Sequence, residues 1–219
     1  MIGRGVLREC LLDPAITRVR TIGRSSSPMQ HAKLTEIVRG DLFHYENIEA
    51  QLTGFDACFF CLGVSSSQVN ASEYERLTYT LTLAAAQTLA RLNPEMTFVF
   101  VSGTGADSSE QGRVGWARVK GKTENAVLSL PFRASFVFRP AAIEPVHGET
   151  SRTPAYRVLY TVLKPLLPVL RRLFPNYVAT TSELGRAMIY VAKRGAAKRV
   201  LESADIRVCV ELAAASDEV

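Results

Sequence analysis

The sequence has few residues of the kinds that bind metals: three histidines and four cysteines among 219 residues. His31, His44 and His147 show no spacing typical of metal ligands. Cys58 and Cys61 form a C-x-x-C pair, but they lie inside the apolar run FDACFFCLG, and no second pair completes a zinc site. We therefore predict no metal centre and interpret the cysteines as buried thiols, which fits a reducing, cytoplasmic location.

The sequence also lacks a signal peptide and any apolar run of about 20 residues, the length that a membrane span requires. Its net charge of +5 and pI of about 9.2 suit small anionic ligands such as nucleotides. The basic residues are scattered, so nothing indicates a nucleic-acid partner. A chain of 219 residues is long enough for one complete core, and we expect a single domain over residues 1–219.

Apolar runs typical of buried strands alternate with helical patterns along the chain. Strands are expected at 17–22, 34–38, 56–62, 98–102 and 135–138. Helices are expected at 6–12, 45–52, 72–92, 116–130 and 180–194, followed by a short strand or helix within 199–212 and a frayed end from 213. This order predicts the α/β class, with a parallel sheet covered by helices on both faces.

The stretch from Phe98 to Lys122 carries the strongest functional pattern. An unbroken apolar strand ends at Ser102, and a helix with Trp116 and Lys120 follows a polar loop. Residues four apart share one helix face, so both side chains can point toward Ser102. In parallel sheets this carboxyl edge is where ligands bind.

A strand-end Ser followed by Y-x-x-x-K resembles the catalytic arrangement of the short-chain dehydrogenase/reductases, and most closely the atypical NAD(P)-dependent epimerase/dehydratase branch that includes the Tat-interacting-protein oxidoreductases. The resemblance implies a Rossmann-type fold in which Ser102 orients the substrate and Lys120 holds the nicotinamide ribose. The position of the catalytic Tyr holds Trp116, whose indole donates a hydrogen bond but does not shuttle protons.

The same resemblance places the pyrophosphate at the start of the first helix, where Ile2 and Gly3 would contact the cofactor and Gly3 matches the third glycine of G-x-x-G-x-x-G. The first two glycines and the first strand of that family pattern do not precede Gly3. The expected Rossmann sheet therefore lacks its first strand, and we expect a protein truncated at its start. A helix that merely begins with Gly is the alternative.

The adenosine end of the cofactor would lie against the second and third strands of the family pattern. Arg24 and Ser25 stand where an acidic residue marks NAD, and an Arg matches a 2′-phosphate, which favours NADP while leaving NAD possible. A solvated Arg in a Ser-rich turn is an equal alternative. Asp41 and Leu42 would flank the adenine, although Asp41 could instead cap the following helix.

Two further turns complete the implied cofactor site. Leu62, Gly63 and Val64 lie where the family places a small-residue turn against the ribose and phosphates. Pro140 and Ala141, after the strand at 135–138, would line the nicotinamide end, with a rigid strand exit as the equal alternative.

Residues 143–180 depart from the core pattern and are interpreted as a substrate-cover insertion. Within them, 155–174 carries Arg157, Lys164 and Arg171 at seven-residue intervals, which could indicate contact with a membrane surface. Pro165 and Pro168 interrupt this stripe, so a substrate cover or a homodimer surface is favoured.

Together these features predict an NADP-binding oxidoreductase or epimerase with a small-molecule substrate. Thr104, Tyr156 or a water would have to replace the missing Tyr. A non-catalytic dinucleotide-binding regulator, which Trp116 favours, and a truncated fragment without function are the alternatives.

Overall fold

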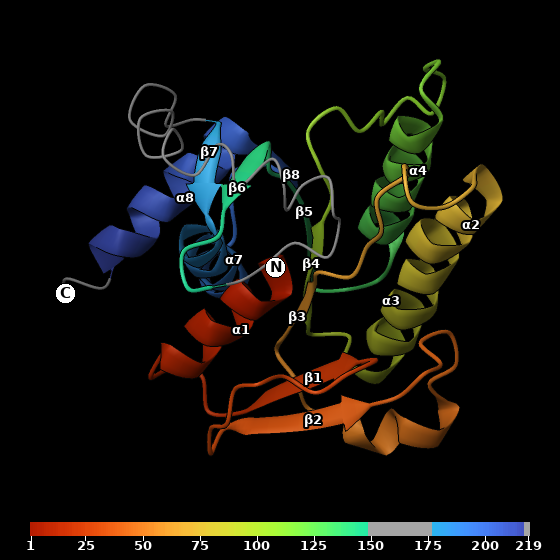
Figure 1. Ribbon diagram of the computed structural model, residues 1–219. Coiled ribbons are helices and arrows are strands. Elements are labelled where there is room, and N and C mark those ends of the chain that lie inside the picture. The colour runs from red at the N-terminus through yellow and green to blue at the C-terminus, as the bar shows by residue number, and fades with distance from the viewer. Residues whose placement is uncertain (149–176, 217–219) are drawn as a thin grey trace.

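The computed structural model describes residues 1–148 and 177–216 of the chain (Figure 1). The expected cover insertion at 143–180, the basic stripe at 155–174 and Tyr156 therefore fall largely or wholly outside the described residues.

Helices and strands alternate from the first residue onward. The first half contains α1 (Ile2–Leu12), β1 (Val19–Gly23), β2 (Leu34–Val38), the 3-10 helix η1 (Glu46–Gln51), β3 (Ala57–Phe60), α2 (Ala71–Glu75), the π-helical turn η2 (Arg76–Thr80) and α3 (Leu81–Leu92). The second half contains β4 (Thr97–Val101), α4 (Gly115–Ser129), β5 (Ala134–Arg139), β6 (Ala142–Glu144), β7 (Val178–Thr180), α7 (Thr181–Arg194), β8 (Val200–Glu202) and α8 (Ser203–Ser216).

Every strand pair is parallel, and helices cover both faces of the larger sheet. That sheet has the order β3-β4-β5-β8, with α3 and α4 on one side and α1, α7 and α8 on the other (Figure 1). The pairs β1-β2 and β6-β7 form two smaller sheets. The predicted α/β class with a parallel, doubly covered sheet is confirmed.

Strand β4 lies at the centre of the core because its side chains alternate between two apolar clusters. Phe98 and Phe100 pack with residues of α3 and α4, whereas Val99 and Val101 pack with residues of α1 and α7. All five residues of β4 are buried. A strand buried on both faces accounts for the unbroken apolar run in the sequence.

The predicted sheet is divided between β1 and β3. Strand β1 pairs with β2, strand β3 pairs with β4, and no strand among the described residues joins the two pairs. Both edges are only partly buried, unlike the central strand.

Several expected boundaries are wrong. The segment expected as a helix at 45–52 forms the 3-10 helix η1. The helix expected at 72–92 begins at Ala71, and it is capped by Asn70, whose side chain accepts the Glu73 N–H at 2.9 Å. The chain remains helical to Ser216 instead of fraying from 213. These ends depend on local hydrogen bonds for which the apolar pattern gives no signal.

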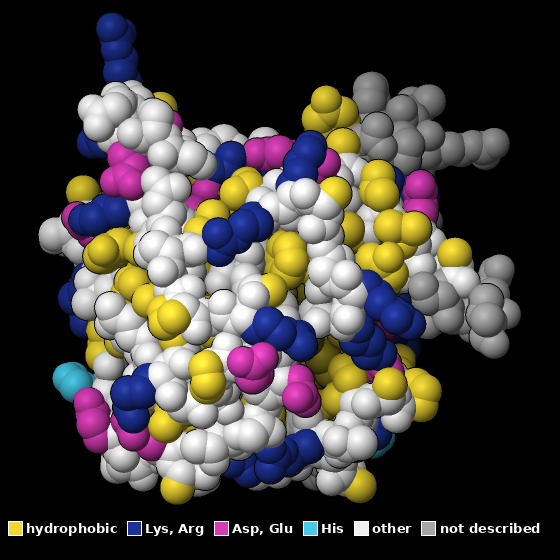
Figure 2. Space-filling model, turned by 180° about the vertical axis from the view of Figure 1, so that it is seen from behind, with side chains coloured by type: hydrophobic (Ala, Val, Ile, Leu, Met, Phe, Trp, Pro, Cys, Tyr) yellow, Lys and Arg dark blue, Asp and Glu magenta, His cyan; other side chains and the backbone are white. Residues whose placement is uncertain are grey.

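Basic side chains are dispersed among acidic and apolar ones on the face opposite that of Figure 1 (Figure 2). No helix within residues 1–148 and 177–216 is long and apolar enough to cross a membrane. Those residues also contain no group of His, Cys, Asp or Glu arranged to hold a metal ion.

Candidate active site

The carboxyl edge of β4 brings together the three residues predicted to be catalytic. Ser102 follows β4 directly and is buried, and its N–H donates to the Phe138 carbonyl of β5 at 2.8 Å. Trp116 and Lys120 lie one turn apart on α4. Lys120 Nζ lies 5.3 Å from the centre of the Phe100 ring on β4. The predicted helix face is therefore turned toward the end of β4.

Trp116 packs against the turn that follows β4. A Cβ atom added to Gly105 would lie 3.3 Å from Cη2 of the indole, and Gly105 has a φ of 89°. Glycine is required at this turn both for its backbone conformation and for the close indole contact. The indole therefore occupies a fixed place beside Ser102-Gly103-Thr104.

The pKa of Lys120 is shifted by its surroundings. Burial lowers its pKa to about 8, and the nearby charge of Glu124 opposes that shift. Within the described residues, its ammonium has a cation–π contact with Phe100 and no hydrogen-bond acceptor. A partly buried ammonium without an acceptor favours a role in binding ligand oxygens.

Ser102 is held by a buried ion pair that the sequence analysis missed. Its hydroxyl donates to the carboxylate of Glu124, which is fully buried on α4. Arg139, the last residue of β5, forms an ion pair with the same carboxylate. Arg139 also donates to Glu202 at 2.8 Å and to Ser108 Oγ at 2.6 Å. One signal was available, since Glu124 stands four residues after Lys120 on the same helix face.

A groove of about 610 Å³ opens beside Trp116, between α2 and the start of α4. Tyr74 and Val119 contribute to its wall, and the Lys122–Glu75 ion pair of 2.7 Å joins the two helices along it. A groove of this volume is within the range that holds small organic ligands.

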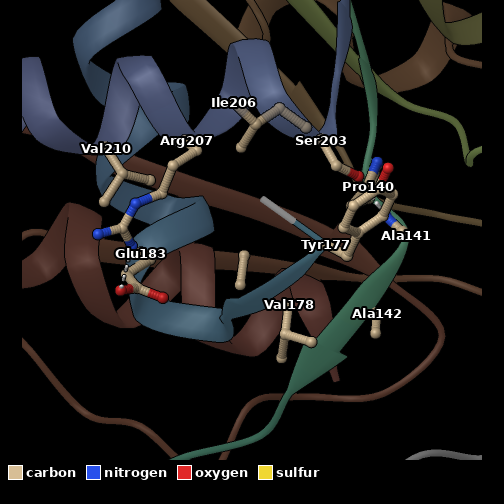
Figure 3. Close-up of a pocket in the computed structure, with 11 residues that line it drawn as sticks. Pro140, Ala141, Ala142, Tyr177, Val178, Glu183, Ser203, Ile206, Arg207 and Val210 are labelled. Carbon is tan, nitrogen blue, oxygen red and sulfur yellow. Dashed lines mark hydrogen bonds and ion pairs between the residues drawn. The ribbon is translucent and has the colours of Figure 1, made fainter. Parts of the chain in front are cut away.

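The second pocket is too small for a substrate. It lies between β6, β7 and α8 and is bordered by Ala141, Tyr177 and Arg207, with Arg207 directed at Glu183 (Figure 3). Its volume of about 10 Å³ is close to that of a single water. The groove beside Trp116 is therefore the candidate substrate site.

Of the two residues expected to replace the missing Tyr, Thr104 lies within the described part of the chain and Tyr156 does not. The Thr104 hydroxyl donates to the Arg139 carbonyl at 3.0 Å, and its N–H donates to the Pro140 carbonyl at 3.2 Å. Thr104 therefore holds the turn against β5.

The turn after β5 is fixed by its own contacts. Pro140 is buried, and the Ala141 N–H donates to Ser203 Oγ at 2.9 Å. These contacts show the rigid strand exit that was one of the two interpretations of this turn.

The predicted adenosine residues lie on the small β1-β2 sheet, apart from the catalytic group. Arg24 and Ser25 are exposed just after β1. Asp41 accepts the Phe43 N–H and the His44 Nδ1, each at 2.7 Å, and these bonds lower the pKa of Asp41. Leu42 is 4% exposed and packs in the core.

The start of α1 lies between the two groups. A Cβ atom added to Gly3 would lie 3.3 Å from Cβ of Cys61, just after β3. Met1, at the N-cap position, makes no side-chain capping bond, and Ile2 packs against the core cluster. Leu62 and Gly63 are exposed after β3, and Val64 is partly buried.

No protein-family profile matches the chain. Solved structures match it over most of its length. A short-chain dehydrogenase family protein from Francisella tularensis superposes with a TM-score of 0.61 at 17% identity, over 89% of this chain and 87% of that protein. The Bordetella bronchiseptica enzyme WbmF, solved with NAD⁺, gives a TM-score of 0.64 at 12% identity, over 96% and 74%.

UDP-glucuronic acid 4-epimerase from Bacillus cereus, solved with NAD, gives a TM-score of 0.64 at 10% identity, over 92% of this chain and 74% of that enzyme. The chain has the short-chain dehydrogenase/reductase fold. The resemblance found in the sequence is thereby confirmed as a shared fold.

The similar curated proteins are fungal. The chain is 30% identical over 149 residues to "Protein fmp52, mitochondrial" of Emericella nidulans, and the match spans 65% of this chain and 63% of that protein. It is 26% identical over 145 residues to "Protein FMP52-2, mitochondrial" of Scheffersomyces stipitis, spanning 65% and 62%. The chain thus spans less than two thirds of these relatives. The expected cytoplasmic location is wrong, because these relatives are named mitochondrial proteins.

Proposed function

We propose that this short-chain dehydrogenase-like chain binds a nicotinamide dinucleotide, NADP in preference to NAD, at the carboxyl edge of its sheet and acts as an oxidoreductase or epimerase on a small molecule. The observation that carries this proposal is the grouping of Ser102, Trp116 and Lys120 at the end of β4, where Trp116 also lines a groove of about 610 Å³. The likeness to two enzymes solved with NAD supports the choice of cofactor.

The residues present fit such a cofactor at its nicotinamide ribose and at its pyrophosphate. The ammonium of Lys120 has no hydrogen-bond acceptor in the described part of the chain, so it would be available for ribose hydroxyls. No side-chain cap bonds to the N-terminus of α1, so the N–H groups of Ile2 and Gly3 would face the phosphates. When bound, the nicotinamide would supply or accept a hydride.

Ser102 limits which substrate oxygen can bind beside it. Its proton is donated to Glu124, so its oxygen keeps lone pairs that accept a hydrogen bond from a substrate hydroxyl. To donate to a substrate carbonyl, Ser102 would have to leave Glu124. The buried carboxylate therefore favours the hydroxyl form of a substrate at this position.

Trp116 supports a second function, a dinucleotide-binding protein without turnover. The indole N–H can donate a hydrogen bond but cannot take up the proton that the phenol of the family exchanges. Binding of cofactor without reaction of any carbonyl substrate would favour this second function. The names of the relatives favour a mitochondrial location for either function.

The preference for NADP is tested by replacing Arg24. Arg24 is exposed just after β1, and its guanidinium would bind a 2′-phosphate through charge-assisted hydrogen bonds, each worth about 1.5–3 kcal/mol. We expect Arg24→Ala to weaken NADPH binding by about 10- to 100-fold and to leave NADH binding nearly unchanged, as measured by calorimetric titration. Arg194→Ala, which removes an exposed arginine from the end of α7, is the control and should change neither. Equal affinity of the starting protein for NADPH and NADH would contradict the preference for NADP. If the starting protein binds neither NADPH nor NADH, the proposal of a nicotinamide dinucleotide cofactor is contradicted.

A further inference from the structure

The groove between α2 and the start of α4 has an aromatic side chain on each of its walls. Tyr74 comes from α2, and Trp116 comes from α4, which lies beside α2 (Figure 1). Burial raises the pKa of the Tyr74 phenol, so this ring stays uncharged. Neither ring stacks on another aromatic ring within residues 1–148 and 177–216. Since aromatic rings stack on planar rings in an offset arrangement, the parts of both rings that border the groove suit a planar ligand.

The charged side chains of the groove balance one another. Lys122 Nζ and Glu75 Oε1 form an ion pair of 2.7 Å. Arg118 donates to a backbone carbonyl of the preceding loop at 2.7 Å, and Glu110 accepts a hydrogen bond from Asn125 Nδ2 at 2.8 Å. Two acidic and two basic side chains therefore line the groove, and its described residues give it no excess of positive charge to hold a phosphate or a carboxylate.

The start of α4 is the feature of the groove that would favour an anion. Gly115 and Trp116 line the groove, and no side chain caps this helix. The partial charge at a helix N-terminus is about half an elementary charge, and the carboxylates of Glu75 and Glu110 line the same groove with full negative charges. The groove as a whole therefore suits an uncharged ligand better than an anionic one.

The indole of Trp116 connects the groove to the end of β4 and supplies a hydrogen-bond donor. A Cβ atom added to Gly105, in the turn after Ser102, would lie 3.3 Å from the indole, and the same indole lines the groove. The indole N–H has no acceptor among the described residues. Because this N–H can only donate, a carbonyl or hydroxyl oxygen on a ring bound in the groove would be a suitable partner.

We propose that the groove binds an uncharged planar aromatic compound that carries a carbonyl group or the corresponding hydroxyl group, and that such compounds are the substrates of this chain. The ligand class follows from the groove alone, whereas its role as substrate rests on the oxidoreductase function proposed above. Interconversion of the ketone and the alcohol moves one hydride between the carbinol carbon and the nicotinamide dinucleotide, and one proton between the substrate oxygen and water.

Equilibrium dialysis with three matched probes tests the ligand class. The probes are 2-acetylnaphthalene, which is planar and uncharged, 2-naphthoate, which has the same ring system and a carboxylate, and 2-acetyldecalin, which is uncharged but not planar. We expect saturable binding of 2-acetylnaphthalene. Binding of 2-naphthoate should be at least about tenfold weaker, because its carboxylate loses water without gaining a partner. Binding of 2-acetyldecalin should be at least about fivefold weaker, because it cannot stack on the aromatic rings.

A substitution in the wall of the groove shows whether the probes bind there. Val119 lines the groove, so Val119→Lys adds a positive charge to it. The preference for 2-acetylnaphthalene over 2-naphthoate should then fall by at least about tenfold, because the carboxylate gains a charged partner. Val208→Lys is the matched control and should leave the preference unchanged, since Val208 is exposed on α8, on the other side of the sheet. A loss of stability that weakens both probes equally does not change this ratio.

Each probe is measured without cofactor and with an excess of NADP⁺, so that the ligand class and the proposed function can fail separately. The ligand class is contradicted if 2-naphthoate or 2-acetyldecalin binds as tightly as 2-acetylnaphthalene, or if no probe binds in either condition. It is also contradicted if Val119→Lys and Val208→Lys give the same preference. Binding of 2-acetylnaphthalene by a protein that binds no dinucleotide would support the ligand class and contradict the role as substrate.

Discussion

At the residue scale, the proposed function depends most on Trp116. It lies on the face of α4 that meets the end of β4, where the resemblance found in the sequence leads us to expect a Tyr, and it borders the groove beside α2. Its indole N–H is a donor only. General acid/base catalysis supplies about 10²–10⁴ in rate, so turnover by the present residues should be slow.

Replacing the indole by a phenol should restore this chemistry. We expect Trp116→Tyr to raise NADPH-dependent reduction of a quinone or a dicarbonyl by at least about tenfold, the lower end of the range for acid/base catalysis. The Lys120 charge one turn away favours the phenolate, so Lys120→Met added to this variant should remove the gain. Fast turnover by the starting protein, slowed by Trp116→Tyr, would show that Trp116 belongs to another mechanism.

Lys120 links the site to the stability of the fold. Its pKa falls from 10.5 to about 8 on folding because burial disfavours the charged form, so the unfolded chain binds more protons between these pH values. Stability therefore rises with pH across this range, and the charged form carries its full cost below pH 8. The charge of Glu124, on the same helix, opposes this cost.

The comparison with a neutral side chain isolates this effect from the other titrating groups. Urea unfolding measures the unfolding free energy of the starting protein and of Lys120→Met. Between pH 8 and pH 10.5, the starting protein should become more stable relative to Lys120→Met. A difference that stays constant over this range would mean that Lys120 keeps its ordinary acidity.

At the element scale, helix α4 fixes the loop that follows β4. Gly121 lies directly against that loop, since a Cβ atom added there would lie 1.7 Å from the Asp107 carbonyl oxygen. The Asp107 N–H also donates to the Ala117 carbonyl of α4 at 3.0 Å. The loop carries Ser108, which binds Arg139, so the close contact at Gly121 supports the ion pair that holds Ser102.

We expect Gly121→Ala to push this loop away from α4, because the contact is with backbone and cannot be relieved by a side chain. The loss in unfolding free energy should be about 1–3 kcal/mol or more, measured by urea denaturation. Gly115→Ala is the matched control, since its Cβ would meet only the Arg118 side chain at 4.0 Å. It should be neutral or stabilising by up to about 1 kcal/mol. Equal effects of the two substitutions would contradict the proposed contact.

The elements that the sequence predicted well are those with local signals. The apolar run of β4 and the capping box of α7, where Thr180 and Glu183 bond reciprocally, can be read from neighbouring residues. The pairing of Glu124 with Arg139 could not be predicted from neighbouring residues. The two residues are 15 positions apart in the sequence and meet only because β5 lies beside β4. The assignment of Ser102, Trp116 and Lys120 needed the family resemblance, since their spacing alone fits many helices.

At the scale of the whole molecule, the predicted site residues fall on two sheets. The larger sheet carries Ser102 and the turn at Pro140, and the small sheet carries Arg24 and the turn at Asp41. A dinucleotide reaching both would cross the edge at which α1 begins.

The single tryptophan of the chain allows the central claim to be tested directly. Trp116 is the only tryptophan among the 219 residues, and it lies at the candidate active site, so its emission reports on that site alone. Bound NADPH should quench the Trp116 emission in a saturable manner and should itself emit when the indole is excited. An excess of NADP⁺ should displace NADPH and so remove the NADPH emission. If calorimetry shows saturable NADPH binding but Trp116 transfers no energy to NADPH, the cofactor binds away from the candidate active site. If neither calorimetry nor fluorescence shows a saturable change, dinucleotide binding by this chain is contradicted.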